Sequence, residues 1–100
     1  MFKRKDKSIN VNKDFTQIEY NNVVEIWLTP THNKTEFIVK LFYNEDDRYV
    51  KASIKTMFED EIIQYIQELK NNNIKLHRLE IPGRIMYRNT KLYYKIFPKG

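Results

Sequence analysis

The sequence predicts one two-layer α+β domain, in which a mostly antiparallel sheet of five to six strands packs against one amphipathic helix. Three observations support this. The chain has 100 residues, enough for one thin core. Its apolar residues alternate with period two on both sides of residues 56–70, where the period becomes helical. No linker or repeat divides the chain, so we expect a basic arm at residues 1–14 and a single domain at residues 15–100, in the order β-β-β-α-β-β-β.

Three strands are expected before the helix. Residues 22–29 (NVVEIWLT) alternate and end before Pro30. Residues 35–43 (TEFIVKLFY) are apolar on both faces, which is typical of a central strand. Residues 48–55 (RYVKASIK) follow the NEDD turn and alternate again. The alternation predicts that these side chains of the first and third strands face the core: Val24, Ile26, Leu28, Val50, Ala52 and Ile54. The same alternation predicts that the following side chains face outward: Val23, Glu25, Trp27, Tyr49, Lys51, Ser53 and Lys55.

The helix prediction rests on a capping signal and on spacing. Thr56 and Glu59 match a capping box, in which each side chain satisfies the other's backbone amide. Apolar residues then recur at helical spacing, and acids precede Lys70, as the helix dipole favours. The asparagine run at residues 71–73 ends the helix.

Three more strands are expected after the helix. Residues 74–81 form the first, and Pro82-Gly83 suits the centre of a type II turn. Residues 85–88 and 91–97 then form a hairpin around a two-residue loop at Asn89-Thr90. In that hairpin, Arg88 faces Lys91 and Arg84 faces Lys95.

The net charge of +5 is unevenly distributed, and such asymmetry points to a polyanionic partner. Residues 1–13, 14–71 and 72–100 carry net charges of +4, −5 and +6. Directly opposed cations destabilise a strand pair, and an anion bound across the expected hairpin would relieve that repulsion. The alternative is a solvated hairpin whose cations protect a sheet edge.

The leading hypothesis is therefore a small non-catalytic nucleic-acid-binding protein that uses this basic and aromatic hairpin, with either DNA or RNA as partner. Its binding residues would be Arg84, Arg88, Lys91, Tyr93, Lys95, Lys75, Arg78, Lys3, Arg4 and Lys5. With about five phosphate contacts, the slope of log affinity against log salt would be roughly −3.5 for single strands.

A second surface is expected on the outer face of the first three strands. It would carry Trp27, Ile38, Phe42 and Tyr49 among Lys40, Lys51 and Lys55. Aromatic residues among lysines can stack on single-stranded bases, but the N-terminal arm, the C-terminal hairpin, a second subunit or another protein can equally cover such a face. The alternative function is thus an interaction protein, an inhibitor or accessory factor of a phage or mobile element. It would bind an acidic protein surface through Trp27, Phe42 and Tyr49.

Enzyme signatures are weak. There is no cysteine, no metal-ligand spacing around the two histidines and no phosphate-binding glycine loop, so we expect no cofactor and no metal. A third hypothesis is a small metal-independent nuclease that uses His77, Arg78, Arg84, Tyr87 and Arg88. No apolar run is long enough to cross a bilayer and no secretory signal is evident, so we expect a cytoplasmic protein without membrane contact.

Overall fold

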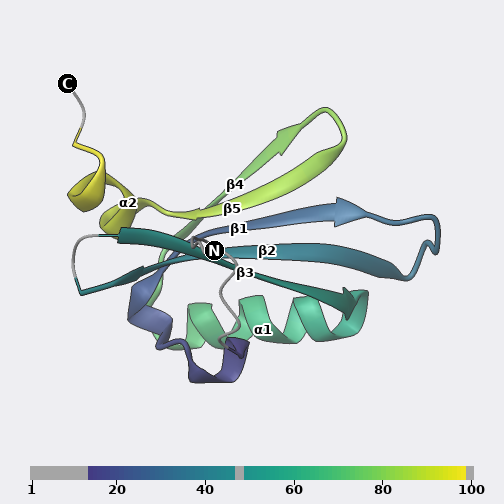
Figure 1. Ribbon diagram of the computed structural model, residues 1–100, viewed down its shortest axis with the longest axis horizontal. Coiled ribbons are helices and arrows are strands. Elements are labelled where there is room, and N and C mark those ends of the chain that lie inside the picture. The colour runs from purple at the N-terminus through teal and green to yellow at the C-terminus, as the bar shows by residue number, and fades with distance from the viewer. Residues whose placement is uncertain (1–13, 47–48, 99–100) are drawn as a thin grey trace, which may run out of the picture.

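The structure, a computed structural model, describes residues 14–46 and 49–98 (Figure 1). Five antiparallel strands form one sheet in the order β3-β2-β1-β5-β4. The strands are β1 (Val23–Pro30), β2 (Glu36–Glu45), β3 (Tyr49–Phe58), β4 (Leu76–Ile81) and β5 (Arg84–Asn89). The helices are α1 (Glu59–Asn71) and α2 (Thr90–Ile96), with 3-10 turns η1 (Phe15–Gln17) and η2 (Tyr20–Asn22). The predicted α+β fold and the central helix are confirmed, and the expected arm at residues 1–14 lies almost entirely outside the described residues.

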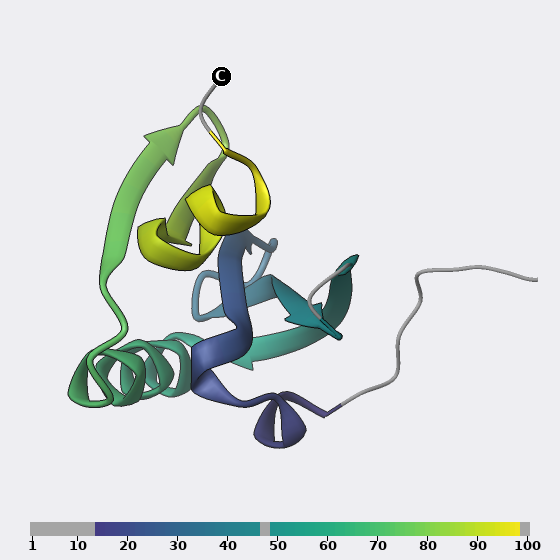
Figure 2. The ribbon, with the colours of Figure 1, turned by 90° about the vertical axis from the view of Figure 1, so that its left-hand side faces the viewer.

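The core lies between α1 and one face of the sheet. Three buried side chains of α1 enter it, namely Ile62, Ile66 and Leu69. The sheet and the connecting segments contribute Phe15, Ile18, Val23, Ile26, Leu28, Val39, Leu41, Tyr43, Met57 and Ile74. Figure 2 shows α1 on one side of the curved sheet and α2 beside the start of β1 and the end of β5. No helix among the described residues is long and apolar enough to span a membrane.

The facing of β3 differs from the prediction. Ser53 pairs with Leu41 of β2, and Ile54 pairs with Lys40. Ser53 is therefore buried at 3 % exposure on the α1 side, whereas Ile54 is 62 % exposed on the other side. Alternation within β3 was predicted well, but the pairing register with β2 sets which face meets α1, and a shift of one residue exchanges the faces.

A β-bulge near the start of β1 produces a second difference. Val23 and Glu25 pair with the consecutive β2 residues Tyr43 and Phe42, so Val24 is the additional residue. The bulge brings Val23 into the core cluster, although simple alternation predicts it on the outer face. Beyond the bulge the alternation holds, and Glu25 lies on the face opposite α1.

Helix α1 begins later than predicted. Thr56 is still in β3, where it pairs with Ile38, so the expected Thr56–Glu59 capping box does not form. Instead, Oε1 of Glu61 accepts a hydrogen bond of 2.9 Å from the backbone amide of Phe58, the residue before the helix. Glu61 therefore caps the helix start two residues later than the predicted pair.

The prediction of a C-terminal hairpin at residues 85–97 is wrong. Gly83, with φ of +85°, connects β4 to β5, as the predicted turn requires, but residues after Asn89 form α2 instead of a strand. The buried Asn89 side chain accepts from the Leu92 amide at 3.1 Å and donates to the Val23 carbonyl at 2.9 Å. This cap starts the helix and anchors it to β1. Leu92 and Ile96 lie four residues apart, a helical spacing that competes with strand alternation.

Tyr65 of α1 provides a stability prediction. Its ring packs on Phe15, and its buried hydroxyl has no hydrogen-bond partner among the described residues. Because a buried hydroxyl without a partner is unfavourable by about 1–3 kcal/mol, Tyr65→Phe is expected to raise the free energy of unfolding by up to about 1 kcal/mol. Tyr20→Phe is the matched control. It removes a hydroxyl that donates to Oε1 of Glu68 at 2.9 Å, so it is expected to lower stability slightly.

The same residue gives a pH dependence. Burial raises the pKa of Tyr65, with contributions from Tyr20 and Glu68. The folded state thus holds this proton more tightly than the unfolded state, whose tyrosines titrate near about 10. The stability that the protonated Tyr65 contributes to the folded state is fully present below about pH 10 and is lost as the pH rises above it. Urea unfolding between pH 8 and 11 should show a smaller alkaline loss for Tyr65→Phe than for the wild type, and equal losses would contradict this assignment.

Candidate functional site

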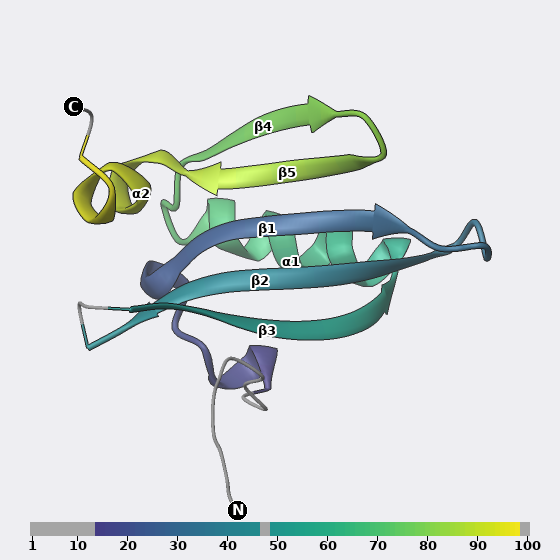
Figure 3. The same cartoon turned by 45° about the horizontal axis from the view of Figure 1, so that its top comes forward.

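The open face, meaning the sheet face opposite α1, carries the most distinctive described side chains. Figure 3 looks onto the sheet with α1 behind it, and α2 is the described helix at one end of this face. The register places Trp27 of β1 at the centre, between Lys40 of β2 and Met86 of β5. Ile54 and Leu79 continue the same row onto the two edge strands.

Trp27 lies among cations and a second aromatic ring. Its ring centroid is 5.1 Å from that of Phe42, at an interplanar angle of 45°. The guanidinium carbon of Arg84 is 4.9 Å from the Trp27 centroid, and Nζ of Lys40 is 5.9 Å from it and 5.8 Å from that of Phe42. These are cation–π distances, each contributing about 0.5–1 kcal/mol at partly exposed sites. The arrangement holds two positive charges next to an aromatic surface.

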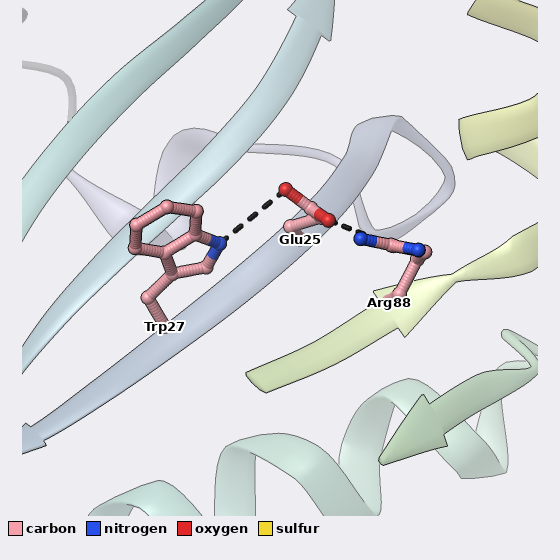
Figure 4. A network of polar contacts seen from close by, with 3 residues as sticks. All are labelled: Glu25, Trp27 and Arg88. Carbon is pink, nitrogen blue, oxygen red and sulfur yellow. Dashed lines mark hydrogen bonds and ion pairs between the residues drawn. The ribbon is translucent and has the colours of Figure 1, made fainter. Parts of the chain in front are cut away.

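A buried carboxylate organises the next row of the open face (Figure 4). Oε2 of Glu25 accepts from Nε of Arg88 at 2.8 Å, and Oε1 accepts from Nε1 of Trp27 at 3.3 Å. The guanidinium carbon of Arg88 also lies 4.0 Å from the ring centroid of Tyr93 in α2. Burial lowers the pKa of Arg88, but the hydrogen bond and charge of Glu25, with Tyr93 and Tyr94, outweigh burial and raise it. Arg88 is therefore fixed in place and already neutralised.

Aliphatic side chains surround the aromatic centre. Ile38, Ile54 and Ile81 are 43 %, 62 % and 40 % exposed, and they lie on β2, β3 and β4 of the open face. Isolated exposed isoleucines are ordinary, but these flank one half-buried Trp27–Phe42 pair on a single sheet face. The open face is thus an apolar surface with cations at its centre.

The cations of the open face differ in their partners. Within residues 14–46 and 49–98, neither Lys40 nor Arg84 forms an ion pair, whereas Arg88 is paired with Glu25. The remaining positive charge of the face is therefore concentrated beside Trp27.

The residues predicted to bind nucleic acid do not form one hairpin face. Because residues 90–96 are helical, Arg88 does not face Lys91 across a hairpin, and Arg84 does not face Lys95. Arg84 and Arg88 lie on the open face, while Tyr93 stacks against Arg88 from α2.

The other residues of that prediction lie elsewhere. Arg78 on β4 forms an ion pair with Glu80. The hydrogen bond to Glu80 makes the largest contribution to a raised pKa of Arg78, and Tyr87 makes a smaller one. Three lysines meet in one hollow beside α2, namely Lys75, Lys91 and Lys95. The predicted binding residues of the N-terminal arm, Lys3, Arg4 and Lys5, lie outside the described residues.

The residues considered for a nuclease are split between the two faces of the sheet. His77 pairs with Arg88, and Arg78 pairs with Tyr87, so alternation sends the two pairs to opposite faces. Arg84 shares the face of His77 and Arg88. The described residues also contain no group of three or more His, Cys, Asp or Glu side chains able to hold a metal ion.

The second predicted surface is brought together in part. Trp27 and Phe42 are in contact, and Ile38 and Lys40 share their face. Tyr49 pairs with Glu45 through its backbone, and its side chain lies outside the described part of the chain.

For two lysines of that predicted surface, Lys51 and Lys55, the prediction is wrong. The β2–β3 register puts Lys51 opposite Tyr43 and Lys55 opposite Val39, on the α1 side. Because the faces of β3 were assigned the wrong way round, the sequence prediction also placed Ile54 in the core and not on the open face. The role of Glu25 was missed because its partner Arg88 is 63 residues away, and no local pattern signals such a pair.

No protein-family model matches the chain, and neither a curated protein nor a solved structure shows significant similarity to it.

Proposed function

We propose that the protein is a non-catalytic interaction module that binds a partner protein through the open face. The partner surface would have an apolar centre flanked by carboxylates. The observation that supports this is the grouping of exposed isoleucines around Trp27 and Phe42, with Lys40 and Arg84 free of described acidic partners.

The size of the open face suits such an interface. Five strands at about 4.8 Å spacing give a width of roughly 19 Å, and a strand the length of β1 adds roughly 26 Å in the other direction. This flat footprint is about 500 Å². The accessible area of its protruding side chains is larger, and approaches the roughly 800 Å² that one partner buries in a standard complex. Half-buried Trp27 at the centre has the composition and position of an interface hot spot.

The chemistry of the open face favours a protein over nucleic acid. Isoleucine offers apolar area but no ring for stacking on bases, and three of them flank the aromatic pair. Arg88, expected to contact phosphate, is instead neutralised by Glu25. Lys40 and Arg84 remain for carboxylates of the partner, where they would steer association.

Two isoleucines of nearly equal exposure provide the test. Ile54 on the open face is 62 % exposed, and Ile63 on α1 is 60 % exposed. The wild type would be immobilised and exposed to a nuclease-treated extract of cells that produce the chain, and the affinity of any recovered protein would be measured with each variant. Ile54→Glu should weaken binding at least about 10-fold, Trp27→Ala about 30-fold or more, and Ile63→Glu less than twofold. Lys40→Glu should slow association and reduce its salt dependence.

Three results would contradict the proposal. The first is recovery of no protein whose binding depends on Ile54, and the second is equal losses for Ile54→Glu and Ile63→Glu. The third is a wild-type dimer in sedimentation equilibrium that Ile54→Glu converts to a monomer. In that case a second copy of the chain, and not an acidic partner, covers the open face.

A further inference from the structure

The lysine hollow, formed by Lys75, Lys91 and Lys95 with their neighbours, is a second concentration of positive charge. Its volume is about 480 Å³, and its other lining residues are Asn21, Asn73, Ile74, Asn89 and Leu92. Figure 2 views this end of the molecule, with α2 above the start of β1, and the lining residues come from η2, the α1–β4 connection, the end of β5 and α2. None of the lining residues is acidic, so three lysines line one hollow whose wall contains no carboxylate.

Folding alone does not favour this arrangement. Lys91 and Lys95 are four residues apart on α2, and like charges at that spacing destabilise a helix by about 0.2–0.5 kcal/mol. Lys75 comes from the connection between α1 and β4 and adds a third charge from another segment. None of the three lysines forms an ion pair with any described residue. A bound anion would remove this repulsion.

The hollow has a fixed frame and free donors. Asn89 uses its side chain to tie α2 to the Val23 carbonyl, which holds Lys91 and Lys95 in place relative to the sheet. The Asn21 and Asn73 side chains are exposed and form no hydrogen bond with other described residues. Amide donors beside ammonium groups are suited to phosphate oxygens.

We infer that the lysine hollow binds a ligand that carries two or more phosphate groups. Its volume lies within the roughly 300–1,000 Å³ of typical ligand pockets. The lysines bind the phosphates as point charges, and the two asparagine side chains donate to their oxygens. The phosphates can belong to a small molecule, such as a diphosphate, or to the backbone of a nucleic acid. This site is separate from the open face, because none of its lining residues is Trp27, Lys40 or Arg84.

The test uses two probes that distinguish these sources, namely inorganic pyrophosphate and a 12-nucleotide single-stranded oligonucleotide. Binding to the full chain would be measured by calorimetry and polarisation. Lys91→Gln/Lys95→Gln is expected to weaken binding of the preferred probe at least about 10-fold at low salt. Lys34→Gln/Lys55→Gln removes the same charge away from the hollow and from the open face, and should change binding less than about twofold. Pyrophosphate binding assigns a small phosphorylated ligand, and binding of the oligonucleotide alone assigns the nucleic-acid backbone.

Salt dependence adds a second measurement for the oligonucleotide. Three lysine contacts predict a slope of log affinity against log salt of about −2, and the double lysine variant, with one contact left, predicts about −0.7. Failure of both probes to bind at low salt would overturn the inference. Equal loss in the two double variants would also overturn it, because net charge and not the hollow would then be responsible. Neither result depends on whether a protein binds the open face.

Discussion

Replacing Arg88 by glutamate is expected to destabilise the fold by about 3 kcal/mol, and not merely to remove a surface charge. The side chains of Arg88 and Glu25 are only 23 % and 11 % exposed, and Nε and Oε2 lie 2.8 Å apart. Removing one partner of a buried pair costs about 3–5 kcal/mol, and the partial exposure of Arg88 places this pair at the lower end. Urea unfolding followed by far-UV circular dichroism measures the change.

The controls separate the ion pair from the general effect of charge. Arg84→Glu changes the same strand and the same net charge without breaking a described ion pair, so it should cost less than about 1 kcal/mol. The double variant Glu25→Leu/Arg88→Met should recover most of the loss, because replacing both charges leaves neither one buried alone. If Arg88→Glu and Arg84→Glu are equally mild, the Glu25–Arg88 pair is not a structural element. A binding assay with Arg88→Glu is therefore informative only after its stability has been measured.

Leu41→Ala is expected to lower the free energy of unfolding by about 3–4 kcal/mol, whereas Ile54→Thr should lower it by less than about 0.5 kcal/mol. Leu41 of β2 is 0 % exposed in the core, and its truncation leaves a cavity in addition to the lost burial. Ile54 of β3 is 62 % exposed, and threonine keeps the β-branched shape that strands favour. Denaturant midpoints and slopes of both variants give the comparison.

This pair of variants also tests the β2–β3 register. Alternation in the sequence favours Ile54 as a core residue, and only its pairing with Lys40 places it on the open face. A loss of 2 kcal/mol or more for Ile54→Thr would mean that Ile54 is buried, either by a different register or by a stable partner in solution. That result would remove the basis for assigning the open face to an acidic protein.

The open face and the lysine hollow are two described surfaces that both concentrate positive charge but differ in chemistry. The open face combines two cations with aromatic and aliphatic side chains, which suits a protein surface. The hollow combines three lysines with asparagine side chains and no described carboxylate in its lining, which suits phosphate. Because the residues differ, variants of Lys40 and of Lys91 affect the two proposals independently.

The sequence by itself determined the features whose causes are local. Period-two alternation located β1 and β3, a short run that is apolar on both faces located β2, and the helical period with its acidic start located α1. Pro82-Gly83 defined the turn between β4 and β5, since Gly83 adopts the positive φ that other residues disfavour. Of the candidate site, the contact between Trp27 and Phe42 could be expected from the outward face of two adjacent strands.

Only the tertiary structure decided the features that depend on distant partners. The register with β2 sets the face on which Ile54 lies, and a bulge brings Val23 into the core. The strand order places β1 between β2 and β5, which brings Glu25 to Arg88 across 63 positions of sequence. Asn89 caps α2 and anchors it to β1, so the last segment is helical although its residues alternate. Local periodicity specifies the type of element, whereas cross-strand pairing between remote segments selects its neighbours and therefore its exposed face.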